Sequence, residues 1–321
     1  MSAPLNYLTS AGARANMILP LTWGVLIISI LVCVIVCGLL VAAIFRRRRV
    51  VGFADNDDDD TRSLLSRPRG GLTWVYVGVG ISTLVLVATT IWTMKTLADV
   101  VSPPREAKLT IEVTGHQYWW EARYFSDQPG QIFTTANEIH IPAGEPVRFK
   151  LIGGDVIHSF WVPALGGKTD TIPGQTNLTW LQADRPGIYR GQCTEYCGKQ
   201  HANMAFFVVA EEAAQFEQWR RQQIAPASPS PDLAQDVAVF QTRCGVCHTV
   251  RGTPAGGKVG PDLTHVMSRG TLAAGTLPNT PGHLTGWIAN PQGVKPGNLM
   301  PQIDMSGADL NAIRTFLQTL S

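Results

Sequence analysis

Two long stretches near the start of the chain contain no charged residue and no histidine. They are residues 17–45 and 72–94. A helix needs about 20 apolar residues to cross a bilayer, so each stretch is long enough to span a membrane. A buried helix of a soluble protein rarely runs so far without a charge. The first stretch is also too long for a signal peptide, and it leads into arginines instead of a cleavage site. The pattern predicts a transmembrane hairpin with helices at 17–45 and 72–97.

The segment between these helices, residues 46–71, is strongly charged. It carries consecutive arginines from Arg46 to Arg49, and further arginines at Arg62, Arg67 and Arg69. Basic residues beside membrane helices stay in the cytoplasm, whereas acidic residues such as Asp57 to Asp60 have little effect on orientation. We therefore predict a cytoplasmic loop in a bacterial inner membrane. The N-terminal segment 1–16 and everything after the second helix would then lie on the periplasmic side.

From about residue 104 the pattern changes to short alternating runs separated by turns. The runs that predict strands are 108–114, 138–141, 146–152, 177–181 and 205–210. Turn sequences with proline followed by glycine, such as Pro186-Gly187, separate them. Several short strands with such turns favour an all-β sandwich. We place this domain at 104–223 and expect it to end in a short polar helix at 211–223.

A second soluble domain follows a segment rich in proline, serine and alanine at 224–231. That composition favours a semi-extended linker, which would tether the next domain at a high effective concentration. Beyond it the pattern becomes helical, first at 233–240. In the closing segment 307–320 one helical face collects apolar side chains, namely Leu310, Ile313, Phe316, Leu317 and Leu320. We predict an all-α domain at 232–321.

Composition excludes some functions. The net charge of the 321 residues is only +2, which gives no reason to expect a nucleic-acid partner. The two membrane segments lack histidine. Haem and copper sites inside a bilayer need imidazole ligands, so we expect the chain not to house an oxygen-reducing centre itself.

The densest chemistry lies between Cys193 and Met204. This short segment also holds Cys197 and His201, and His158 lies upstream. Thiolates, imidazoles and a thioether suit copper, and the second cysteine provides for two ions that share bridging thiolates. The alternatives are a structural zinc site and a disulfide. The methionine argues against zinc, which rarely binds a thioether.

A second motif is Cys244-Gly-Val-Cys247-His248. C-x-x-C-H is the signature of covalently attached c-type haem, in which the cysteines form thioethers and the histidine binds iron. A redox dithiol is the alternative, but it leaves His248 unexplained. The segment 259–263 can supply a carbonyl oxygen to the second ring nitrogen of this histidine.

We expect the opposite axial ligand of the haem iron to be Met300. It lies on a turn constrained by proline and glycine, whereas the competing candidates Met267 and Met305 lack such a setting. Ligation by methionine and histidine raises the haem potential and suits electron transfer.

The copper motif resembles subunit II of the haem-copper cytochrome c oxidases. The resemblance rests on the segments 115–120, 158–163, 168–174 and 185–193 around and before the loop. It implies a cupredoxin-like barrel that holds the dinuclear CuA centre. Cys193 and Cys197 would bridge the two coppers, and His158 and His201 would each bind one. The weak ligands would be Met204 and the backbone carbonyl of Glu195.

The same resemblance implies roles outside the copper ligands. The carboxylate of Glu195 would bind a magnesium ion shared with the partner subunit, because hard oxygen ligands suit that ion. The aromatic run Tyr118, Trp119 and Trp120 would form the surface where electrons enter from a docked cytochrome. In the family this run begins with tryptophan, and Tyr118 departs from that pattern.

Residues 232–321 resemble a class I cytochrome c fused to subunit II, as in caa3-type oxidases. The resemblance implies an electron donor such as a c-type cytochrome, and subunits I and III as partners. Subunit I would reduce oxygen to water with proton translocation. One alternative is the equivalent subunit of a nitric oxide reductase that contains CuA. An alternative of another class, a membrane-anchored copper-binding or copper-delivery protein, would need no haem. A nitrous oxide reductase would need a propeller domain, for which there is no room.

Overall fold

The structure is a computed structural model that describes residues 5–45 and 71–321. One unit comprises Leu19–Val100, and the other comprises Met1–Ile18 with Val101–Ser321. The predicted cytoplasmic arginines, and the acidic run that follows them, lie outside the described residues.

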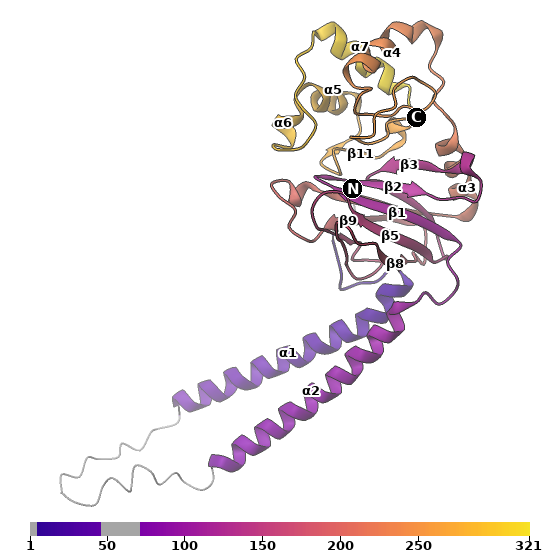
Figure 1. Cartoon of the computed structure of the whole chain (residues 1–321). Helices are drawn as coiled ribbons and strands as arrows, with labels where there is room; N and C mark the ends of the chain where they lie inside the picture. The colour runs from indigo at the N-terminus through magenta and orange to yellow at the C-terminus, as the bar shows by residue number, and fades with distance from the viewer. Residues whose placement is uncertain (1–4, 46–70) are drawn as a thin grey trace, which may run out of the picture. The chain divides into compact units, whose positions relative to one another are not determined.

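The two predicted membrane helices are present and longer than expected (Figure 1). Helix α1 spans Ala13–Phe45 and α2 spans Gly71–Val101, which are 33 and 31 residues. At about 1.5 Å per residue, either helix exceeds the roughly 30 Å hydrocarbon core of a bilayer. Their large apolar side chains, such as Ile44 and Trp74, are mostly exposed within the chain. Exposed apolar side chains over this length suit lipid contact.

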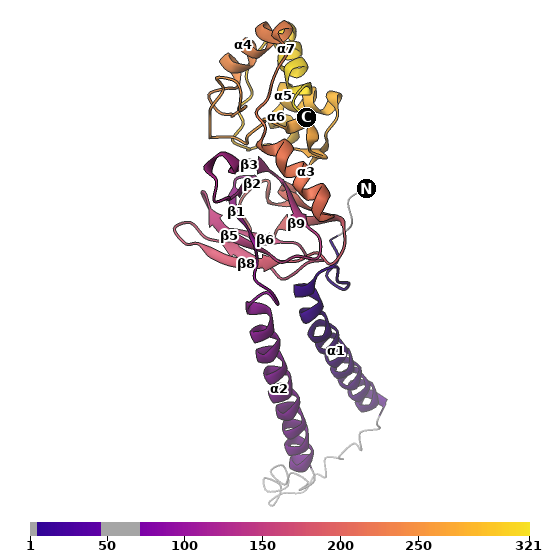
Figure 2. The same ribbon diagram turned by 90° about the vertical axis from the view of Figure 1, so that its right-hand side faces the viewer.

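The predicted β-sandwich is present (Figure 2). It consists of two sheets of five strands, the first with the order β3-β2-β1-β5-β8 and the second with the order β4-β10-β9-β6-β7. The strands are β1 Leu109–His116, β2 Trp119–Tyr124, β3 Phe133–Ala136, β4 Glu138–Pro142, β5 Val147–Gly153, β6 His158–Trp161, β7 Thr169–Thr171, β8 Asn177–Leu181, β9 Gly187–Cys193 and β10 Ala205–Glu211. All five strands predicted from the pattern are confirmed.

The core of the sandwich is aromatic and lies behind the copper motif. Phe160 stacks on Phe206 at 4.5 Å between ring centroids, and Trp120 meets Phe206 at 5.3 Å. Gly191 on β9 makes this packing possible, since a Cβ there would lie 2.2 Å from Phe206 Cζ. Strand β9 therefore runs close to the core, and its last residue, Cys193, is buried.

The start of the chain is attached to the sandwich. The amide of Ala11 donates to the carbonyl of Ala164 at 2.8 Å, and the amide of Asp184 donates to the carbonyl of Ala11 at 2.9 Å. The guanidinium of Arg14 also donates to the hydroxyl of Thr179. These contacts attach the N-terminal residues to the sandwich.

The C-terminal domain has a helical core of its own. Helices α4 Ala234–Arg243, α5 Pro281–Ala289, α6 Pro291–Val294 and α7 Gly307–Gln318 are joined by long loops and one short hairpin, β11 Thr271–Leu272 with β12 Leu277–Pro278. Phe240 on α4 packs edge-on against Phe316 on α7 at 5.1 Å. Ser306 caps α7 by accepting a hydrogen bond from the amide of Asp309. The all-α prediction is confirmed, and the small hairpin is an addition to it.

The short polar helix predicted at 211–223 is α3, Ala213–Ile224. Its Trp219 stacks on His140 of β4 at 4.0 Å. The imidazole of His140 also lies between two carboxylates, with Nε2 3.2 Å from Glu138 Oε1 and Nδ1 3.0 Å from Glu211 Oε2. Burial works against the imidazolium, but the two carboxylates outweigh it and raise the pKa of His140 above 6.5. Burial raises the pKa of Glu138, but the hydrogen bonds from His140 and the amide of Gly270, with the charge of Arg269, hold it below 4.5.

This cluster predicts a pH-dependent stability. The contribution of His140 is fully present below about pH 6.5 and is lost as pH rises through the raised pKa. The contribution of Glu138 is present above about pH 4.5 and is lost as pH falls through the lowered pKa. We expect His140→Gln to lower the unfolding free energy by about 2 kcal/mol near pH 5.5 and by clearly less near pH 9. Urea unfolding of the solubilised chain, followed by tryptophan fluorescence, measures both values.

The exposed His283 provides the control, because His283→Gln should change stability by less than about 0.5 kcal/mol at either pH. An equal loss for His140→Gln at both pH values would contradict the ion-pair interpretation.

Candidate metal centres

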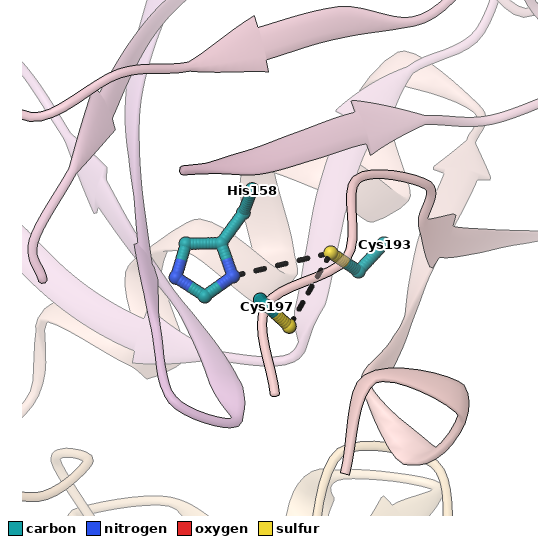
Figure 3. Close-up of side chains that lie close together, drawn as sticks. All are labelled: His158, Cys193 and Cys197. Carbon is teal, nitrogen blue, oxygen red and sulfur yellow. Dashed lines mark hydrogen bonds between the residues drawn. The ribbon is translucent and has the colours of Figure 1, made fainter. Parts of the chain in front are cut away.

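The predicted copper donors converge at one end of the sandwich (Figure 3). Cys193 Sγ lies 3.9 Å from Cys197 Sγ and 3.9 Å from Nδ1 of the fully buried His158. Ligand atoms of these three residues all lie within 4.8 Å of one another. The sulfur atoms are too far apart for a disulfide, whose bond is about 2.05 Å. The geometry therefore favours a metal site over the disulfide alternative.

The remaining donors divide between the two sulfur atoms. Cys193 Sγ also lies 3.3 Å from the carbonyl oxygen of Glu195. Cys197 Sγ lies 3.7 Å from His201 Nδ1 and 3.8 Å from Met204 Sδ. Donors that share one tetrahedral ion with bonds of about 2.0–2.3 Å are separated by roughly 3.3–3.8 Å. The donor spacing thus fits metal ligation, with one imidazole and one weak donor beside each cysteine.

The C-x-x-C-H motif lines a cavity in the helical domain. This cavity has a volume of about 270 Å³, and Cys244, Cys247, His248 and Met300 all face it. Most other lining side chains are apolar, including Leu263, Leu272, Leu284, Ile288, Ile303 and Leu317. Both cysteines are free thiols. The two attachment sulfurs and both expected axial ligands therefore border one apolar cavity, which fits a c-type haem.

The orientation of His248 agrees with iron ligation. Its Nδ1 lies 2.8 Å from the carbonyl oxygen of Pro261, which confirms the predicted carbonyl partner and leaves Nε2 free for a metal. Gly260 lies close to the ring, since a Cβ there would be 2.6 Å from His248 Cε1. Met267 and Met305 pack against the helical core instead of lining the cavity. Their position favours Met300 as the opposite ligand.

Known proteins share both domains. Residues 123–211 match the family described as cytochrome c oxidase subunit II, periplasmic domain, and residues 237–321 match the cytochrome c family. The cytochrome c oxidase subunit 2 of Alkalihalophilus pseudofirmus is 38% identical over 311 residues, which are 95% of this chain and 86% of that relative. The chain belongs to the cytochrome c oxidase subunit II family. Its cytochrome c domain makes it subunit II of the caa3 type, and its two domains imply copper and haem c as cofactors.

A second relative agrees with this assignment. The cytochrome c oxidase subunit 2 of Bacillus sp. strain PS3 is 33% identical over 267 residues, which are 78% of this chain and 73% of that relative. Among solved structures, the periplasmic domain of subunit II of cytochrome oxidase from Bradyrhizobium japonicum is 34% identical, with a TM-score of 0.35. That likeness covers 37% of this chain and 95% of the solved one.

In this subunit II chain, the sulfur atoms of Cys193 and Cys197 lie 3.9 Å apart, within hydrogen-bond reach of each other. This hydrogen bond, opposed by burial and assisted by His158 and backbone contacts, lowers the pKa of Cys193 to about 4. The pKa of Cys197 is raised in turn. At neutral pH the pair therefore carries a thiolate, the form of cysteine that binds metals.

Two residues that were not predicted from the sequence orient the copper donors. The Oδ1 atom of Asp155 lies 2.7 Å from His158 Nε2, which leaves Nδ1 facing the thiol of Cys193. The side chain of Gln117 donates to the carbonyl of Cys197 at 2.6 Å, and its backbone amide donates to Asp155 at 2.6 Å. Carboxylate partners of this kind fix the tautomer and direction of a ligating histidine. An aspartate three residues before His158 was the sequence signal that could have predicted this orienting contact.

The side chain and the backbone carbonyl of Glu195 face different neighbours. The carbonyl faces Cys193, whereas the carboxylate is 45% exposed and lies 3.6 Å from the ammonium of Lys168. The carboxylate therefore remains accessible to a partner from outside the chain.

The aromatic run predicted for electron entry lies partly in the sandwich core. Trp120 is fully buried in the sandwich core, edge-on to His158 at 5.9 Å, and Tyr118 is 7% exposed. Trp119 is half-buried, stacks on His116 at 4.5 Å and, with Tyr118, lines the haem cavity from the sandwich side. The C-terminal domain contacts this run through Lys295, whose ammonium donates to the carbonyl of Tyr118 at 2.9 Å.

Proposed function

We propose that this chain accepts electrons from a c-type cytochrome or similar donor and delivers them to subunit I. There oxygen is reduced to water with proton translocation, and subunit III completes the complex. The observation that carries the proposal is that one chain holds two separate donor sets, each suited to a one-electron centre. In this scheme the chain carries electrons, and the bonds of the substrate are made and broken in subunit I.

The copper site proposed here is dinuclear. Cys193, Cys197, His158, His201, Met204 and the backbone carbonyl of Glu195 would hold the two ions. In the helical domain Cys244 and Cys247 would attach the haem, and His248 and Met300 would bind its iron. When bound, these centres take up and release single electrons. The protein fixes their ligands in advance, so that little rearrangement accompanies each electron.

Two further assignments belong to this proposal. The exposed carboxylate of Glu195 would bind magnesium together with subunit I, because its backbone carbonyl is already directed at the copper donors. Both redox domains and both termini would lie on the periplasmic side of the inner membrane. Attachment of Ala11 and Arg14 to the sandwich supports a common side for the N-terminus and the redox domains.

Gas uptake by the purified complex, supplied with reduced c-type cytochrome, tests the function. The expected result is rapid oxygen consumption, with proton release outside sealed vesicles. Uptake of nitric oxide without oxygen consumption would instead identify a nitric oxide reductase. A complex that binds copper, carries no haem and consumes neither gas would identify a copper-delivery protein.

A further inference from the structure

A buried lysine joins the cytochrome c domain to the copper domain. Lys295 follows α6 and is 2% exposed. Its ammonium donates to three backbone carbonyls, those of Tyr118 at 2.9 Å, Asn203 at 2.8 Å and Ala273 at 3.1 Å. Tyr118 and Asn203 belong to the sandwich, whereas Ala273 belongs to the cytochrome c domain. All three protons of the ammonium therefore have acceptors, and two of these acceptors lie across the domain boundary.

The acceptors lie next to the two candidate redox sites. Asn203 immediately precedes Met204 in the copper loop, and Tyr118 lines the haem cavity. Lys295 itself also lines that cavity, five positions before Met300 in the sequence. The lysine thus contacts the predicted copper loop through Asn203, and through Tyr118 it contacts the lining of the haem cavity.

Other hydrogen bonds cross the same boundary. The side chain of Gln200 donates to the carbonyl of Pro296 at 2.9 Å, and the amide of Ala205 donates to the carbonyl of Ala274 at 3.1 Å. The amide of Gly270 donates to Glu138 Oε2 at 2.9 Å. These bonds make the boundary a specific interface.

Backbone strain at the interface is a second, independent observation. Ala273 and Ala274 have φ angles of 50° and 56°, in the left-handed region that alanine rarely adopts. Their carbonyls accept from Lys295 and from the amide of Ala205 respectively. Such residues persist only where their surroundings hold them in place, and strained segments are concentrated at functional sites.

Burial makes the position costly for a lysine. It lowers the pKa of Lys295 to about 7, with only a weaker opposing effect from Cys197. Among the described residues no carboxylate lies within ion-pair distance of this ammonium. A methionine or leucine could fill the space without that cost, so the three carbonyl contacts are the reason for a lysine here.

We propose that Lys295 is a positioning residue for electron transfer: it fixes the cytochrome c domain on the copper loop, so that haem and copper keep one short separation. This inference rests on the proposed function, because it assumes that both centres are present. The rate of electron tunnelling falls steeply with distance, so a domain that swings on the linker would transfer electrons more slowly than one that is held in place.

The test uses the full complex with Lys295→Met, and Lys108→Met as the control at an exposed lysine of the copper domain. Hydrogen–deuterium exchange first reports docking without any turnover. We expect the interdomain amides of Ala205 and Gly270 to exchange at least about tenfold faster in Lys295→Met, while the β5 amides stay protected. Lys108→Met should leave all of them unchanged.

The second readout is the rate of electron transfer from haem to copper after photoreduction of the haem. In Lys295→Met it should fall at least about tenfold, at unchanged redox potentials and unchanged copper and haem spectra. Lys295→Arg, which keeps the positive charge and the hydrogen-bond donors, should retain part of the wild-type electron-transfer rate. Unchanged exchange and an unchanged rate in Lys295→Met would overturn the proposal.

A wild-type measurement covers the case in which the variant does not assemble. A fixed interface predicts that the transfer rate is independent of solvent viscosity, whereas a domain that must diffuse on its linker predicts a rate that falls as viscosity rises. The second result would overturn the role of Lys295 and leave the proposed function intact. Absence of a copper or haem spectrum would instead refute the proposed function.

Discussion

Replacing Cys193 with serine is expected to remove the dinuclear copper centre and to stop electron delivery to subunit I. This sulfur lies close to three of the other predicted donors, namely Cys197, His158 and the carbonyl of Glu195. It is also the thiol whose pKa is lowered to about 4, so it is the readily ionised ligand. A serine hydroxyl is a hard, neutral donor that cannot bridge two copper ions.

The expected loss in oxygen uptake exceeds about a hundredfold, because even changes to outer partners of metal ligands cost 10–100-fold. Metal analysis should show copper reduced relative to haem, while the c-type α band stays intact. The matched control is Cys33→Ser, since Cys33 is an exposed thiol on α1. A Cys193→Ser complex with full copper content and normal oxygen uptake would refute the site.

Replacing Met300 with leucine is expected to leave the haem attached and to lower its reduction potential. Cys244, Cys247 and His248 would still hold the group, but the thioether that raises the potential would be missing. Axial ligands set haem potentials over about 0.8 V, so a fall on the order of 0.1 V is a conservative expectation. At about 59 mV per tenfold, this fall makes reduction by the donor roughly fiftyfold less favourable.

A redox titration of the α band measures this shift directly. Met267→Leu and Met305→Leu serve as controls, because both side chains pack against the helical core. Their haem potentials should match that of the wild type. A normal haem potential in Met300→Leu, together with a shifted potential in either control, would show that Met267 or Met305 is the axial ligand and that Met300 is not.

Two of the predicted strands, β1 and β5, show clear alternation. In β5, for example, Val147, Phe149 and Leu151 are buried while the residues between them are not. Strands β4 and β10 were predicted although most of their residues are buried, and β2 and β9 were missed although their burial alternates. Strand β6 was not predicted, and it has no alternation because His158, Ser159 and Phe160 are all buried. Strand β7 is only three residues long, too short for any period to show.

The candidate ligands could be predicted because most of them lie in two compact motifs. The residues that orient them could not, since their roles depend on tertiary contacts. Gln117 reaches the carbonyl of Cys197 across 80 positions of sequence, and Lys295 reaches that of Tyr118 across 177. The sequence suggested a tethered cytochrome domain. It did not predict the interface formed by Lys295, because every residue has a backbone carbonyl and the sequence does not show which of them accept hydrogen bonds.

The most direct test of two redox centres in one chain is absorption and EPR spectroscopy of the purified periplasmic part, from Pro104 onward, matured with haem and loaded with copper. We predict a reduced c-type α band together with a multi-line EPR signal from mixed-valence copper. A c-type band with mononuclear copper or zinc would contradict the dinuclear site and leave a membrane-anchored cytochrome.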